Sequence, residues 1–183
     1  MTNKLFRQLA DIYATMDRAW EMTASQYGFQ CEGCEDNCCK SLFFHHTFVE
    51  KTFLIHGFEQ LTPNIKKEAR TKAMIYYHKT FPNGEMPASL KLMCPLNQDG
   101  RCLVYGYRPM ICRLHGLPHE LHKPGSAPFK GPGCPAGKFN ETPYIPFDRT
   151  PFYKGMATVE MKFRQRTGRL GKIKETVAQM LLF

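Results

Sequence analysis

Apolar residues recur at three- and four-residue spacing along the first part of the chain, from residue 5 to residue 23. This period places them on one face of an amphipathic helix. Thr2 is a suitable N-terminal cap, and Gly28 is a suitable stop signal. We expect the apolar face to pack into a core rather than to hold a cofactor. Its members are Leu5, Phe6, Leu9, Ile12, Tyr13, Met16, Trp20 and Thr23.

Two further helices are predicted close together in the sequence. Residues 47–50, Thr-Phe-Val-Glu, have the form of a capping box that opens a short helix ending near Gly57. Thr62 and Pro63 combine a cap residue with proline at the first helical position, and the pattern then continues to about Thr80. Because the connection is short, we expect these two helices to pack as an antiparallel pair.

Prolines, glycines and short apolar runs dominate residues 81–151. Asn97 to Gly100 is typical of a tight turn between two short extended segments, and Arg108-Pro109 is a suitable start for a turn of helix. A loop region of this length is unusual in a compact domain unless something organises it. A bound metal would do so, because metal binding supplies folding energy where apolar burial is small.

The C-terminal part returns to helical patterns. Thr150-Pro151 opens an amphipathic helix that stops near Gly168, and residues 173–181 form a last short one. The predicted fold is therefore mainly α: one small helical domain spanning residues 1–183, with helical flanks at 1–30 and 150–183. Its irregular, loop-rich centre is expected to be organised by a cysteine-ligated metal site.

Composition narrows the cellular setting. The 183 residues are 43% hydrophobic and 22% charged, as in ordinary globular proteins, and no apolar run is long enough to span a membrane. The N-terminus carries Asp11, Asp17 and Glu21 where a signal peptide would need an unbroken apolar stretch. We therefore expect a cytoplasmic protein without membrane attachment. In a reducing cytosol, eight cysteines favour metal binding or catalysis over disulfides.

The cysteines themselves form a suggestive pattern. The Cys31-x2-Cys34 spacing lets two sulfurs grip one ion, and an adjacent Cys38-Cys39 pair follows within five residues. The spacing leaves open two four-cysteine sites, one site with spare thiols, or a multinuclear centre. Neither the radical-SAM spacing nor the bacterial ferredoxin run is present. The predicted metal ligands are Cys31, Cys34, Cys38, Cys39, Cys94, Cys102, Cys112 and Cys134.

These motifs resemble the YkgJ-type cysteine-cluster family over roughly residues 31–135. The first block is Cys31-x2-Cys34-x3-Cys38-Cys39, one residue longer than the C-x2-C-x2-C-C pattern of that family. The second runs from Cys94-Pro-Leu through Gly-Arg-Cys102-Leu-Val-Tyr and Arg-Pro to Cys112-Arg113. The resemblance implies that the chain chelates zinc or iron. The family includes proteins similar to the flagellin lysine N-methylase.

The identity of the metal remains open between two chemistries. All-sulfur ligation suits both zinc and iron–sulfur clusters. Close cysteine pairs, which structural zinc favours, occur only in the first block, whereas the later cysteines are widely spaced. Together with the methylase resemblance, this favours an iron–sulfur cluster, a 4Fe-4S cluster first, with zinc as the alternative.

Four other residues lie close enough to the cysteines in sequence to matter. Arg108 and Arg113 flank Cys112, so their guanidinium groups would donate to cluster sulfurs or bind an anionic substrate. A structural salt bridge with an acid near Cys31 is the competing interpretation for both. Tyr105 is a further cofactor-binding candidate, with packing as its alternative. His115 follows Cys112 by three residues and is a candidate ligand or proton carrier.

No nucleophile triad, phosphate loop or dinucleotide fingerprint occurs, so an enzymatic role rests on Arg108, Arg113 and His115 as candidate catalytic residues. The leading hypothesis is a redox or protein-modifying metalloprotein acting on a protein or small molecule. The rival is a non-enzymatic zinc-stabilised domain that binds a protein or, less favoured, a nucleic acid through its basic C-terminal helices. Those helices carry Lys154, Lys162, Arg164, Arg166, Arg169, Lys172 and Lys174.

Overall fold

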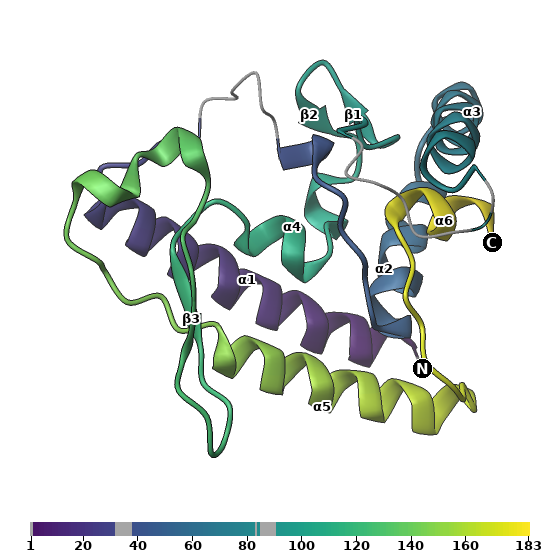
Figure 1. Ribbon diagram of the computed structural model, residues 1–183. Helices are drawn as coiled ribbons and strands as arrows, with labels where there is room; N and C mark the ends of the chain where they lie inside the picture. The colour runs from purple at the N-terminus through teal and green to yellow at the C-terminus, as the bar shows by residue number, and fades with distance from the viewer. Residues whose placement is uncertain (1, 32–37, 83, 85–90) are drawn as a thin grey trace. The chain divides into compact units, whose positions relative to one another are not determined.

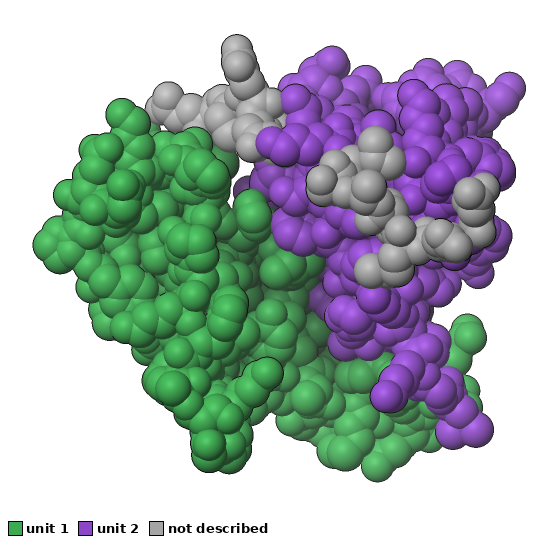
Figure 2. Space-filling model, in the orientation of Figure 1, with its two compact units in different colours: residues 1–34, 110–169 green, residues 35–109, 170–183 purple. Residues whose placement is uncertain are grey.

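The computed structural model describes residues 2–31, 38–82, 84 and 91–183. The predicted mainly α fold is confirmed, because helices dominate the described chain and its strands form two short two-stranded sheets. The chain is divided into two compact units, each built from two separate stretches of sequence (Figure 2). Unit 1 comprises residues 1–34 and 110–169, and unit 2 comprises residues 35–109 and 170–183. The single domain expected from the sequence stays a prediction.

Unit 1 is organised by its first helix. The apolar face predicted for this helix is buried, with Leu9 and Met16 fully enclosed, and α5 runs beside it (Figure 1). Phe163 supplies part of the facing surface from α5. Gly28 has φ +62°, which ends the first helix because a left-handed backbone suits glycine. The elements are α1 (Thr2–Gln26), α4 (Met110–Leu114), β3 (His119–Leu121), β4 (Phe129–Gly131), η3 (Pro135–Gly137), η4 (Phe139–Glu141) and α5 (Thr150–Thr167).

Unit 2 has its own core, formed where three helices meet. Leu54 and Phe58 come from its first helix, Ala69 and Ala73 from the second, and Leu181 from the last. The second of these helices, α3, packs mainly against α6 and meets α2 over a smaller contact near Phe58 and Glu59, so the expected pair of α2 and α3 is not the main packing of this unit. The elements are η1 (Cys38–Lys40), α2 (Phe48–Glu59), α3 (Pro63–Thr80), β1 (Asn97–Gln98), β2 (Arg101–Cys102), η2 (Tyr105–Tyr107) and α6 (Val177–Leu182).

The C-terminal segment is bonded into unit 2 before α6 begins. The backbone N–H of His45 donates to the carbonyl oxygen of Glu175 at 2.8 Å, and the Glu175 N–H donates back at 3.1 Å. The Lys51 ammonium also pairs with the Glu175 carboxylate at 2.8 Å. Thr176 then closes a capping box with Gln179 at the start of α6. These contacts hold α6 where its apolar side completes the core.

Most of the helix starts predicted from local sequence occur in the structure. Thr47 caps α2 by accepting from the Glu50 N–H, and α3 begins at Pro63 with Thr62 as its cap residue. Thr150 lies inside α5, whose N-cap position is Arg149. The β3–β4 hairpin was not predicted. None of the described helices combines the length and the apolar character needed to cross a lipid bilayer.

Candidate metal centre

The eight cysteines are divided evenly between the two units. The boundary falls inside the first cysteine block, between residues 34 and 35. Cys34 lies outside the described residues, and the seven described cysteines form no disulfide with one another. Unit 1 contains Cys31, Cys34, Cys112 and Cys134, whereas unit 2 contains Cys38, Cys39, Cys94 and Cys102.

In unit 2, backbone hydrogen bonds bring two cysteine segments together. The Cys94 N–H donates to the carbonyl oxygen of Cys39 at 2.8 Å, which joins the 91–96 segment to η1. The Asn97 N–H then donates to the Cys94 carbonyl oxygen at 2.9 Å, so the chain turns directly into β1. Across the β1–β2 ladder, Asn97 is the register partner of Cys102. Three of the unit's cysteines are therefore tied to one small piece of backbone, and Cys38 adjoins them in η1.

The turn between β1 and β2 explains why this segment folds as it does. Asp99 and Gly100 have φ values of +50° and +81°, the left-handed pair that a two-residue hairpin turn requires. Asn97 supports the turn, because its Oδ1 accepts from the Gly100 N–H at 3.2 Å. The tight turn predicted at 97–100 is thus confirmed, and it sets the position of Cys102 relative to Cys94.

The thiols of unit 2 interact with one another. A hydrogen bond with the Cys38 side chain, helped by the Asn97 side chain and the Arg108 charge, lowers the pKa of Cys39 to about 6. Burial raises the pKa of Cys94 to about 12, and the neighbouring Cys102 and Cys39 sulfurs act in the same direction. Cys94 is thus affected by the charges of Cys39 and Cys102, and Cys39 is hydrogen-bonded to Cys38, as expected for neighbouring thiols.

Asn97 contributes a buried donor beside these sulfurs. Its residue surface is only 8% exposed, and its Nδ2 has no hydrogen-bond partner of ordinary geometry among the described residues. The same amide acts on Cys39 as a donor that favours the thiolate. An unsatisfied buried N–H is costly, so its position next to a sulfur suits a site where that sulfur becomes a thiolate.

Arg108 and Tyr105 form a pair at the edge of this group. The Arg108 guanidinium carbon lies 3.6 Å from the centroid of the Tyr105 ring, and its charge stabilises the Cys39 thiolate. Tyr105 is 62% exposed, and the structure connects it to the site through its ring contact with Arg108. Sequence reasoning connected Arg108 with Cys112, whereas the structure brings it near Cys39.

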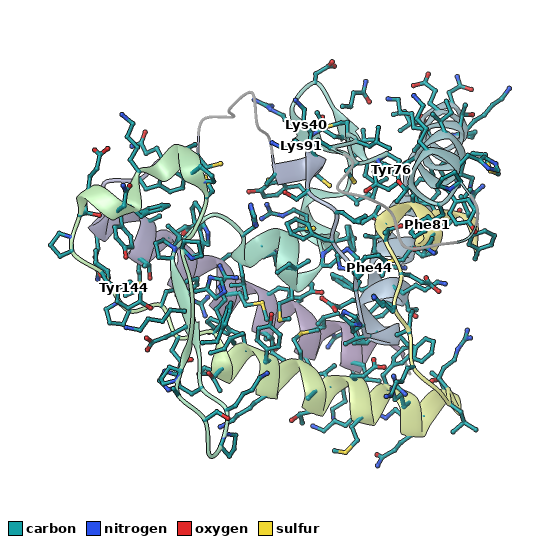
Figure 3. The ribbon with its side chains drawn as sticks, viewed as in Figure 1. Lys40, Phe44, Tyr76, Phe81, Lys91 and Tyr144 are labelled. Carbon is teal, nitrogen blue, oxygen red and sulfur yellow. The ribbon has the colours of Figure 1, made fainter. Side chains whose placement is uncertain are left out.

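Tyr76 is a neighbour of Cys94 that the sequence did not identify. It lies on the buried side of α3, and the negative charge of the Cys94 sulfur adds to burial in raising the pKa of its hydroxyl (Figure 3). Tyr76 lies at helical spacing from the buried Ala69 and Ala73, but nothing in the sequence spacing relates α3 to the Cys94 segment. Only the tertiary packing of unit 2 brings the two together.

Arg113 is held inside unit 1 by a salt bridge and a cation–π contact. Its guanidinium donates to Asp17 Oδ2 at 2.5 Å and lies over the Tyr13 ring, 4.1 Å from the centroid. Both partners belong to α1, so the salt bridge joins α4 to the central helix of unit 1. The acids near Cys31 that were expected to pair with the arginines all lie outside the described residues.

The remaining predicted residues of unit 1 are less closely connected. Burial, reinforced by the Arg149 charge, lowers the pKa of His115, whose backbone carbonyl oxygen accepts from the Trp20 indole at 2.9 Å. Cys134 donates its N–H to the Gly116 carbonyl oxygen at 2.7 Å, which brings its segment next to the end of α4 and thus toward Cys112. Cys31 is exposed.

Among the described residues, no group of three or more histidine, cysteine, aspartate or glutamate side chains lies at metal-ligand spacing. The donor chemistry of unit 2 nevertheless fits a thiophilic metal, because the unit contains four thiols, and the Arg108 charge and the Asn97 amide act on one of them, Cys39. The structure thus brings the segments that carry these cysteines together, but it does not place their sulfurs at the spacing of metal ligands.

A family model spanning residues 30–126 matches the chain, which is just over half of its length. The chain belongs to the CxxCxxCC family. That family is described as a "putative zinc- or iron-chelating domain". The CxxCxxCC match covers every cysteine except Cys134, and it confirms the resemblance seen in the sequence. The comparisons with curated proteins and with solved structures gave no match.

Proposed function

We propose that this CxxCxxCC protein carries a cysteine-ligated iron–sulfur centre and serves a redox or protein-modifying reaction. The observation that carries the proposal is the 2.8 Å bond from the Cys94 N–H to the Cys39 carbonyl oxygen. It joins the two cysteine blocks that are far apart in the sequence. A family described as chelating zinc or iron supplies the matching chemistry.

The surroundings of the unit 2 sulfurs favour a cluster over a lone zinc ion. Reduction potentials of iron–sulfur clusters depend on hydrogen bonds to the sulfurs and on nearby charge. Asn97 offers an amide donor at Cys39, and Arg108 offers a cation there. When bound, an iron–sulfur centre would supply one-electron chemistry, and these two side chains would tune it.

Within this proposal the other predicted site residues take supporting roles. Arg108, backed by Tyr105, faces the Cys39 thiol and would attract an anionic substrate as well as stabilise the centre. His115 stays a candidate proton carrier of unit 1, where its lowered pKa favours the neutral imidazole. Arg113 would act mainly through its ion pair with Asp17.

The test is metal and acid-labile sulfide analysis with a visible spectrum, on protein purified without oxygen. We expect iron and sulfide in comparable amounts, with absorbance near about 400 nm. A parallel sample stripped with chelator and dialysed controls for loosely bound metal. Zinc without sulfide would overturn the iron–sulfur assignment, and no bound metal at all would overturn the proposal.

Zinc without sulfide would favour the rival, a zinc-stabilised binding domain. Its basic surface is divided, because the cations of α5 belong to unit 1 whereas Lys172 and Lys174 belong to unit 2. Arg164 also pairs with Glu160 at 2.6 Å, and Lys174 lies over the Phe44 ring at 4.6 Å. RNA binding measured across a salt series would test this rival, since phosphate contacts weaken steeply with salt.

A further inference from the structure

The division of the chain into units separates cysteines that the sequence motif groups together. The first block contains Cys31, Cys34, Cys38 and Cys39, and its spacing leaves the division of these cysteines among sites open, yet the unit boundary lies between Cys34 and Cys38. We propose instead that unit 2 holds one complete four-thiolate metal site. Its ligands are Cys38, Cys39, Cys94 and Cys102, and its metal is thiophilic, either zinc or iron. This inference rests on the proposed function and assigns its ligands.

The first support is the backbone that carries these four residues. The Cys94 segment is bonded to η1 through Cys39, and it leads by a single turn into the hairpin that carries Cys102. Leu103 continues the same connection, because its N–H donates to the Leu96 carbonyl oxygen at 2.8 Å. Four thiols thus come from two short segments that are already joined, so little chain entropy remains to be lost when a metal binds.

The second support is the anchoring of these segments on the core of unit 2. Leu96 and Val104, which flank the hairpin, are 1% and 3% exposed within the core shared by α2, α3 and α6. Cys94 and Cys102 pack against the same core. A ligand set built on a rigid core holds its geometry better than one on free loops.

The third support is the unpaired Nδ2 of Asn97. Oδ1 of this buried amide is already used by the Gly100 N–H, so the side chain cannot turn away without losing that bond. Its N–H2 group is left to point at Cys39, and a metal-bound thiolate is the acceptor that would satisfy it. Asn97 is therefore a positioning residue for the Cys39 ligand.

The chemistry of the set agrees with this assignment. Four cysteine thiolates match tetrahedral zinc or an iron–sulfur cluster, and harder ions prefer oxygen ligands. Because the described thiols do not yet stand at ligand spacing, metal binding is expected to draw them together through side-chain rotation.

Cobalt(II) titration of the full-length apo protein tests the partition, because thiolate-to-cobalt charge transfer reports each sulfur-ligated site. The single substitutions Cys38→Ser, Cys39→Ser, Cys94→Ser and Cys102→Ser should each abolish the same one equivalent of binding. The double variant C94S/C102S should lose no more than either single variant. Cys31→Ser and Cys134→Ser, from unit 1, are the matched controls and should retain that equivalent. Circular dichroism checks that each variant keeps its helices.

Two outcomes separate this inference from the proposed function. If the wild-type chain binds no metal, the proposed function fails. If it binds metal, but C94S and C102S bind as much and C31S loses the equivalent, the proposed function stands and the partition into units is overturned.

The role of Asn97 has its own test. Asn97→Asp keeps the acceptor for Gly100 and removes the N–H2 donor, whereas Gln98→Glu adds the same charge at an exposed position of the same strand. We expect Asn97→Asp to weaken cobalt binding by roughly 10- to 100-fold, as is usual for lost supporting hydrogen bonds. Gln98→Glu should change it little. Equal effects of the two substitutions would overturn the positioning role.

Discussion

His45 is a buried imidazole with an unsatisfied ring nitrogen. The residue is 3% exposed, and its Nε2 has no hydrogen-bond partner among the described residues. Burial, together with the positive charge of His46, lowers its pKa from 6.5 to about 4. The folded chain therefore holds this ring neutral, because burial disfavours its charged form.

The pH dependence of stability follows from that shift. The unfolded chain binds a proton at His45 near pH 6.5 and the folded chain only near pH 4, so protonation favours unfolding as pH falls through this window. Above pH 6.5 the neutral ring costs no stability, and near pH 4 its effect has lowered the free energy of unfolding by about 3 kcal/mol. In His45→Gln, the free energy of unfolding measured with urea should change much less between pH 6.5 and pH 4. His46→Gln, at the exposed neighbour, provides the control: it leaves the burial of His45 in place and should keep most of the pH dependence, because burial is the larger cause of the shift.

Arg113 illustrates a structural cation whose partner can be removed. Its side chain is 4% exposed and that of Asp17 is 35% exposed, so the pair is only partly screened by water. Asp17→Asn removes this counter-charge from the buried guanidinium and should lower the free energy of unfolding by about 2 kcal/mol. Asp11→Asn, at an exposed position of the same helix, should cost much less in the same denaturation assay. Bound metal should be unchanged in both variants.

For single residues, the sequence indicated which side chains are candidates for the site, but it did not indicate which residues they contact in the fold. It selected the cysteines and the arginines, because thiols and guanidinium groups have few ordinary roles in such a pattern. It could not connect Arg113 to Asp17 or Tyr76 to Cys94, since these residues lie on elements that meet only in the folded chain. It also could not relate His119 to Gly131: His119 is half-buried, and a Cβ added at Gly131 would lie 2.3 Å from its ring.

At the scale of elements, local signals were reliable where local chemistry decides the structure. Caps at Thr47 and Thr62 and the left-handed turn at Asp99 and Gly100 depend on a few adjacent residues, so they were predicted. The β3–β4 hairpin has short strands without alternating hydrophobicity, and the pairing of α3 with α6 joins distant parts of the sequence. Neither has a local signature, so both were missed.

The contact of α2 with η2 depends on one glycine. A Cβ at Gly57 would lie 2.2 Å from the Tyr107 ring, and the nearest atoms include the base of that side chain. Gly57→Ala should therefore destabilise the chain by about 1–2 kcal/mol, since overpacking exceeds the roughly 1 kcal/mol gain in helix propensity. Thermal unfolding measures the change. In a Tyr107→Ala background the same substitution should become neutral or stabilising, and an unchanged cost there would contradict the contact.

For the whole molecule, the site is harder to predict than the family. Fixed offsets in the two cysteine blocks were enough to predict the CxxCxxCC family, which the family model confirms. The division of the cysteines between the units was not predictable, because Cys34 and Cys38 are close in sequence but belong to different units. Where a unit ends is decided by packing, and spacing along the chain does not record it.

Metal removal should affect stability at this scale. If a thiophilic metal binds the folded chain and not the unfolded one, a free concentration 100-fold above its Kd stabilises the chain by about 2.7 kcal/mol. Chelator-treated protein should then unfold at lower temperature and be cut more readily by protease within residues 91–109. Restoring the metal should reverse both effects. Identical melting curves with and without metal would contradict a metal that organises the fold.

The interleaving of the units has a consequence for synthesis. A ribosome makes residues 1–34 of unit 1, then 35–109 of unit 2, and only afterwards the segments that complete each unit. Unit 1 is complete only when α5 has been made, and unit 2 only when α6, which follows α5, has been made. The thiols of Cys38 and Cys39 therefore emerge long before the helix that closes their core. A nascent chain would present these sulfurs to cellular metal, oxidants and chaperones until α6 has been made.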